Sequence, residues 1–99
     1  MIRDITTLSE LKSVSAVGKV MLVFHATWCG PCKIYKRVYE RINETISDVT
    51  VIRADVDESP ELKEHFNIRS VPATVIINGG NTTAKNGIVP YPLLENMLS

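Results

Sequence analysis

Trp28-Cys29-Gly30-Pro31-Cys32 is the stretch that decides how this chain is interpreted, because it holds both of its cysteines. The pair directly follows an apolar run, Val20 to Phe24, and directly precedes a stretch with helical periodicity. Two side chains three positions apart at a helix start are neighbours, and their separation suits a disulfide. The arrangement therefore predicts two thiols that close into a disulfide and reopen.

The two thiols differ in their place on the expected helix. A thiolate is the reactive form of cysteine, and a helix N-terminus favours it through free N–H groups and the helix dipole. Cys29 lies where the helix should begin and is the better candidate for the attacking thiolate, whereas Cys32 lies one turn on. Gly30 permits a tight entry turn, and Pro31 suits the first turn because it has no N–H to satisfy.

Two other interpretations of the pair stay open, namely inert buried thiols and half of a zinc site. Zinc usually takes four ligands. Beyond the two cysteines, the chain offers only His25 and His65 as further histidine or cysteine ligands, and their spacing is unlike that of a zinc finger. We therefore expect no metal.

Length and composition predict one folded domain that covers residues 1–99, with 44% apolar residues to form its core. Eleven basic residues balance eleven acidic ones, so no net charge favours nucleic acid or an anionic membrane. The start, Met1 to Ile5, lacks the pattern of a secretory signal, and the longest apolar run is too short to span a bilayer. We expect a cytoplasmic protein with no nucleic acid or membrane as a direct partner.

Strand and helix signals alternate along the chain. Strands are expected at residues 2–6, 20–24, 49–54, 73–77 and 82–85, and helices at 8–17, after the cysteine pair, from 59–60 to about 66, and at 92–98. The run 20–24 is apolar at every position, which is typical of a strand covered on both faces. Asn78-Gly79-Gly80-Asn81 is a hairpin signal. The order β-α-β-α-β-α-β-β-α predicts an α/β fold with a parallel first part and an antiparallel edge.

Three local signals refine the helices. The stretch after the cysteine pair repeats its apolar residues every four positions, which predicts that these side chains face the core. The repeat comprises Ile34, Val38, Ile42 and Ile46, with Tyr35 and Tyr39 beside it. Thr7 and Glu10 form a capping-box pattern before the first helix, in which Leu8, Leu11 and Val14 or Ala16 should face inward and which Gly18 should end. Ser59 is the expected cap of the helix that begins at Pro60.

The chain resembles the thioredoxin family over nearly its whole length. Trp28-Cys29-Gly30-Pro31-Cys32-Lys33 matches the active-site motif of thioredoxins at every position. The resemblance continues through Ala54-Asp55-Val56-Asp57, Ile68-Arg69-Ser70-Val71-Pro72-Ala73-Thr74 and Asn78-Gly79-Gly80, in the family's order and spacing. It implies the thioredoxin fold, with a central mixed sheet of about five strands flanked by helices.

The resemblance also implies a function, that of a protein disulfide reductase acting by dithiol–disulfide exchange. Cys29 would attack a substrate disulfide, and Cys32 would resolve the mixed disulfide. The substrates would be protein disulfides, and an NADPH-dependent flavoprotein thioredoxin reductase would reduce the pair again. No bound cofactor would be needed beyond the redox-active Cys29–Cys32 disulfide. The protein would be a monomer that serves electron transport and cell redox homeostasis.

The resemblance assigns further residues to substrate docking. Pro72 matches the family's cis-proline, which faces the active-site pair and leaves the backbone of Val71 free to pair with an extended substrate segment. Trp28, Val56, Val71, Pro72 and Gly87 would form an apolar docking patch. Ordinary core and turn roles would explain the same residues, Val56 and Val71 in particular.

The chain departs from the family's pattern close to the cysteines. Many thioredoxins bury an Asp where this chain has Val23, and valine cannot accept the proton of the resolving thiol. We therefore expect Cys32 to lose its proton more slowly, or through water. His25 lies on the same strand face as Val23, at a position that is often aromatic in bacterial relatives. It would either tune the pKa of Cys29, or shuttle a proton, or merely pack near Trp28.

Two other functional classes were weighed against the reductase. The alternative is a thioredoxin-fold binding subunit or scaffold of a larger complex with little redox turnover, which the intact cysteine motif argues against. A glutaredoxin-like protein or an oxidase usually carries a different dipeptide between its cysteines, so Trp28 and Gly30-Pro31 argue against both.

Overall fold

A five-stranded mixed sheet forms the centre of the molecule, with the strand order β1-β3-β2-β4-β5. The computed structural model describes residues 2–15 and 18–99. The elements are β1 (Arg3–Asp4), α1 (Leu8–Ser15), β2 (Lys19–His25), α2 (Gly30–Thr45), β3 (Val49–Asp55), α3 (Pro60–His65), β4 (Ala73–Asn78), β5 (Asn81–Asn86) and α4 (Tyr91–Leu98). The predicted element order and α/β class are confirmed. Residues 16 and 17, where the first helix was expected to end, lie outside the described residues.

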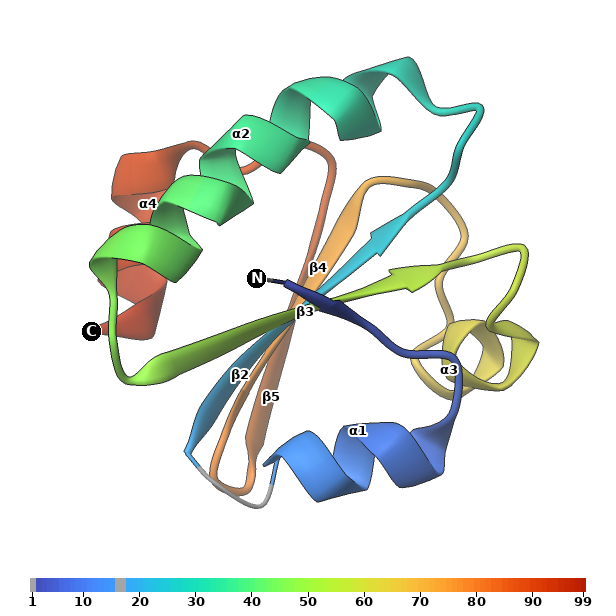
Figure 1. Ribbon diagram of the computed structural model, residues 1–99, viewed down its shortest axis with the longest axis horizontal. Coiled ribbons are helices and arrows are strands. Elements are labelled where there is room, and N and C mark those ends of the chain that lie inside the picture. The colour runs from blue at the N-terminus through green and yellow to red at the C-terminus, as the bar shows by residue number, and fades with distance from the viewer. Residues whose placement is uncertain (1, 16–17) are drawn as a thin grey trace.

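Helices cover both faces of the sheet. Figure 1 shows α2 and α4 on one side and α1 and α3 on the other. The apolar run in β2 supplies both layers, because alternate side chains of a strand point to opposite faces. Met21 and Val23 pack in the core under α2 and α4, whereas Leu22 and Phe24 pack in the core on the other face. All four side chains are fully buried, as predicted for a strand covered on both faces.

The register of the strands brings three charged or titratable side chains to one end of the sheet. β2 runs parallel to β3, with His25 opposite Asp55, and antiparallel to β4. The short edge strand β1 runs parallel to β3 and sets Asp4 opposite Arg53. His25, Asp4 and Arg53 therefore lie at the end of β2 from which the chain passes to α2.

The hairpin between β4 and β5 forms as predicted. Asn78 pairs with Asn81 across the turn, and Gly79 takes a φ of +62°, which glycine adopts without strain. Gly87 ends β5 with a φ of +79°, and its N–H donates to the carbonyl of Pro72 at 2.8 Å. This bond fixes the end of β5 against the loop that precedes β4.

Two expected side-chain positions are wrong. Ile34 is 63% exposed, and α2 instead buries Cys32, Tyr35, Tyr39 and Ile42. A helix turns about 100° per residue, so a four-residue repeat drifts by about 40° at each step and its first and last members face different ways. Ser59 precedes α3 but makes no side-chain cap, because its hydroxyl donates to the carbonyl of Ile5 at 3.3 Å.

Candidate active site

The cysteine pair lies where β2 passes into α2. Cys29 is the N-cap residue of α2, and Cys32 lies in its first turn. The two form a disulfide, with their Cα atoms 5.3 Å apart. The spacing of the motif thus yields the predicted disulfide at the predicted helix start.

Burial does not distinguish the two cysteines, but hydrogen bonding does. Cys29 is 4% exposed and Cys32 is 6% exposed. The N–H of Cys32 donates to Sγ of Cys29 at 3.2 Å, so the helix directs a first-turn amide at the first sulfur. Residues 30–33, which form that turn, include no acidic side chain. Negative charge at Cys29 is therefore favoured by the amide and by the helix dipole.

Two uncharged hydroxyl groups are buried near Val23, the position at which this chain lacks a carboxylate. Val23 is fully buried and pairs across the sheet with Thr74. The hydroxyls of Thr74 and Tyr35 share a hydrogen bond of 2.7 Å, and both side chains are buried. Burial raises the pKa of Tyr35 to about 12. Neither hydroxyl ionises near neutral pH, so this pair cannot replace a carboxylate as a proton acceptor.

The residues assigned to docking lie around the loop between α3 and β4. The Val71–Pro72 peptide bond is cis. Trp28, Val56 and Val71 line one small cavity of about 80 Å³, and Trp28 is 68% exposed. Gly87 joins the group through its bond to the Pro72 carbonyl. The structure thus brings Trp28, Val56 and Val71 to one cavity and ties Gly87 to Pro72.

Asp57 holds the exposed tryptophan in place, and sequence reasoning missed this role. The indole Nε1–H of Trp28 donates to Oδ2 of Asp57 at 2.8 Å. The backbone N–H of Asp57 in turn donates to Oδ1 of Asp55 at 2.9 Å. The sequence did offer one signal for this residue, because Asp57 belongs to Ala54-Asp55-Val56-Asp57, a segment that carries the family resemblance.

A second group of polar side chains lies around a different cavity, which Cys32 also lines. His25, Cys32, Lys36, Tyr39 and Arg53 all border one cavity of about 390 Å³, together with Ala26, Thr27 and Lys33. Arg53 donates to both carboxylate oxygens of Asp4, at 3.0 and 3.2 Å, and to the hydroxyl of Tyr39 at 3.4 Å. The cavity places His25 on the same opening as the second cysteine.

The imidazole of His25 is incompletely paired. Its Nε2 is buried, and no hydrogen-bond partner reaches it within the described part of the chain. Oδ1 of Asp4 lies 3.8 Å away. Burial lowers the pKa of His25, and the Arg53 charge lowers it further, while Asp55 and Asp4 act in the opposite direction. At neutral pH the imidazole is therefore uncharged and able to accept a proton.

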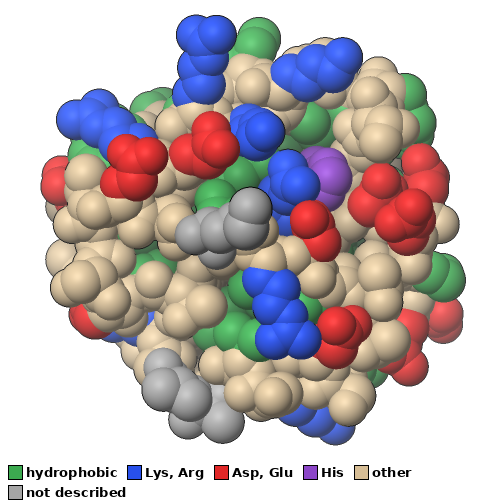
Figure 2. Space-filling model, viewed as in Figure 1, with side chains coloured by type: hydrophobic (Ala, Val, Ile, Leu, Met, Phe, Trp, Pro, Cys, Tyr) green, Lys and Arg blue, Asp and Glu red, His purple; other side chains and the backbone are tan. Residues whose placement is uncertain are grey.

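The residues that the structure describes form neither a metal site nor a helix that could span a membrane. Within residues 2–15 and 18–99, no group of three or more His, Cys, Asp or Glu side chains is arranged to hold a metal ion. No helix in those ranges combines the length and the apolar character that crossing a bilayer requires. Figure 2 shows lysine and arginine side chains gathered over α2 on the face that it displays.

A cysteine pair that closes into a disulfide at the start of α2, beside a cis-proline loop, defines a thiol–disulfide oxidoreductase. Comparison with known proteins narrows this class. The sequence model of the thioredoxin family matches residues 6–98. The thioredoxin of Mycoplasmoides gallisepticum is 33% identical over 98 residues, which are 97% of this chain and 98% of that protein.

Two further relatives bear on structure and domain arrangement. The crystal structure of oxidised mitochondrial thioredoxin 3 from Saccharomyces cerevisiae superposes with a TM-score of 0.89 at 29% identity, covering 98% of this chain and 92% of that one. The bifunctional thioredoxin reductase/thioredoxin of Mycobacterium leprae is 39% identical over 79 residues, which are 78% of this chain and 17% of that protein. The chain belongs to the thioredoxin family. It is a protein disulfide reductase, and the fold and function implied by its motifs are confirmed.

Proposed function

We propose that Cys29 is the attacking thiolate and Cys32 the resolving thiol of this reductase. The observation that carries the assignment is the hydrogen bond from the Cys32 N–H to Sγ of Cys29 at the helix start. A hydrogen bond and a helix N-terminus both favour the charged form of a sulfur, so Cys29 ionises first in the reduced protein.

The exchange then proceeds in two steps. The Cys29 thiolate attacks one sulfur of a substrate disulfide, and the other substrate sulfur leaves as a thiolate and takes a proton from water. Cys32 loses its proton and attacks Sγ of Cys29, which releases the second substrate sulfur. Two electrons pass from the Cys29–Cys32 dithiol to the substrate, and the disulfide described above is the product.

Substrate docks over the apolar side of the site in this proposal. Trp28, Val56, Val71, Pro72 and Gly87 form the docking patch, supported by the small cavity that three of them line and by the exposure of the Trp28 ring. Gly30 and Pro31 shape the turn that presents Cys29. An extended substrate segment would pair with the backbone at Val71.

The partners follow from the direction of electron flow. A reductase must itself be reduced after each cycle, and we propose an NADPH-dependent flavoprotein thioredoxin reductase as its electron donor. The fusion of a reductase with a thioredoxin in the Mycobacterium leprae relative supports this pairing. A reducing compartment such as the cytoplasm suits a disulfide reductant, and the monomeric state stays a prediction.

Insulin reduction tests the assignment, with each cysteine serving as the control for the other. Cys29→Ser should abolish turnover, because no thiolate remains to attack. Cys32→Ser should also lose turnover but should accumulate a mixed disulfide with the substrate, visible as an added mass on Cys29. A mixed disulfide that forms through Cys32 in the Cys29→Ser protein would reverse the two roles. A Cys29→Ser protein that keeps full activity would refute the mechanism.

A further inference from the structure

We infer that His25 is the proton acceptor for the Cys32 thiol in the resolving step. This inference rests on the proposed roles of the two cysteines. It concerns Cys32 and not Cys29, because the cavity under α2 opens on Cys32 and His25 together, whereas Cys29 does not line it.

The surroundings of Cys32 leave few other acceptors. Val23 offers no acceptor, and the hydroxyl of Thr74, opposite Val23 in the sheet, is bonded to that of Tyr35. Among residues 2–15 and 18–99, the imidazole of His25 finds no hydrogen-bond partner for its buried Nε2. The shared cavity of about 390 Å³ exceeds the volume of several water molecules, so a proton can pass from sulfur to imidazole through solvent.

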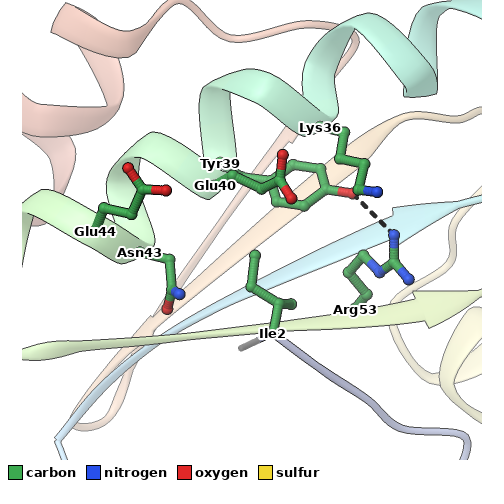
Figure 3. A pocket seen from close by; sticks show the side chains of 7 residues that line it. All are labelled: Ile2, Lys36, Tyr39, Glu40, Asn43, Glu44 and Arg53. Carbon is green, nitrogen blue, oxygen red and sulfur yellow. Dashed lines mark hydrogen bonds between the residues drawn. The ribbon is translucent and has the colours of Figure 1, made fainter.

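The positive charges around the cavity favour loss of the proton from Cys32, while Arg53 also lowers the pKa of His25. Lys36 and Arg53 border both this cavity and the adjoining one of about 370 Å³ shown in Figure 3, where a dashed line joins Arg53 to Tyr39. Their positive charges stabilise a thiolate on Cys32 once its proton has left. The titratable and charged groups around His25 come from β1, β3 and α2, and they are Asp4, Arg53, Asp55, Lys33, Lys36, Tyr39 and Cys32.

The proton of Cys32 and the electron pair of the breaking bond each have a destination in this step. The neutral imidazole takes the proton of the Cys32 thiol as that sulfur bonds to Sγ of Cys29. The bond between Cys29 and the substrate sulfur breaks, and the substrate leaves as a thiolate with the electron pair. The imidazolium then passes its proton to solvent through the open cavity, where Asp4 stands 3.8 Å from Nε2. His25 returns to its neutral form for the next cycle.

Rapid mixing of the reduced protein with dithiobis(nitrobenzoate), a chromogenic aromatic disulfide, separates the two thiols. Attack by Cys29 releases the first chromophore at a rate proportional to reagent concentration, and attack by Cys32 releases the second at a rate independent of it. His25→Gln should slow the second release by about tenfold or more at pH 7, since general bases contribute factors of this size and above. The first release should change less than about twofold, because Cys29 does not line the cavity that His25 shares with Cys32. His65→Gln, at an exposed histidine on α3, is the matched control.

Two further variants distinguish proton transfer from a structural role. Added imidazole should restore the second release in His25→Ala, and a packing defect would not respond to it. Asp4→Asn should shift the pH inflection of the second release to lower pH, because a carboxylate that raises the pKa of His25 is removed.

An unchanged second release in His25→Gln would overturn the inference, and so would an equal slowing of both releases. Failure of the underlying cysteine assignment looks different: the Cys32→Ser protein would then give no first release, whatever residue stands at position 25.

Discussion

Val23, Tyr35 and Thr74 show how single residues set the chemistry beneath the disulfide. A carboxyl group buried in this apolar core would be costly in its protonated and in its charged form, because both forms lose their hydrogen bonds with water. The chain instead buries two hydroxyls that satisfy each other at 2.7 Å. This part of the core is therefore neutral, and in our proposal the acid–base work falls to His25, which shares a cavity with Cys32.

Removing the Tyr35 hydroxyl tests how much this buried pair stabilises the fold. Tyr35→Phe should lower the free energy of unfolding by about 1–3 kcal/mol, because the buried Thr74 hydroxyl loses its partner. Thr74→Val alone should have a similar effect, and the double variant should lose clearly less than the sum. Chemical denaturation of the four proteins measures this coupling. Additive losses would show that the bond contributes nothing of its own.

The capping of α1 shows how a few side chains fix the residue at which a helix begins. The Glu10 N–H donates to the Thr7 hydroxyl at 3.2 Å, and the Glu10 carboxylate accepts from the Thr7 hydroxyl and from the backbone N–H of Thr6. The capping box predicted from sequence is present, although the carboxylate reaches the amide of Thr6. These bonds, with the Thr6 amide first, lower the pKa of Glu10.

The cap predicts a pH-dependent helix start. Because the folded-state pKa of Glu10 is lowered, its contribution is complete above the ordinary value of 4.5 and is lost as the pH falls through the lowered pKa. Glu10→Ala should reduce amide protection in the first turn of α1 at pH 6, measured by hydrogen exchange. Wild type should approach the variant near pH 3, while Glu64→Ala on α3 should leave α1 unchanged. Equal protection in wild type and Glu10→Ala at pH 6 would rule out the cap.

At the scale of the whole molecule, sequence patterns predicted the helices and strands better than they predicted which distant residues meet in the folded protein. The run 20–24, the hairpin at Asn78–Asn81 and the cysteine motif each follow from local physics, and each is confirmed. The exposure of Ile34 was missed, because a repeat of four drifts around a helix and does not say which of its residues meet the sheet.

The cavity beside Cys32 could not be predicted from local sequence patterns. It depends on Asp4, whose two-residue strand binds the edge of β3, and on Arg53, which bridges Asp4 and Tyr39. These three residues lie 14 to 49 positions apart along the chain. Contacts between residues so far apart in the sequence depend on how β1 packs against the sheet, and no local sequence pattern indicates them.

Alkylation of the reduced protein by iodoacetamide at pH 7 shows whether the fold ionises one particular sulfur. Peptide mapping at short times reports which cysteine reacts and how fast. Cys29 should react about tenfold faster than free cysteine, because helix-terminal cysteines ionise at lower pH, and Cys32 should react far more slowly. Equal reactivity with free cysteine, or modification of Cys32 before Cys29, would contradict the account.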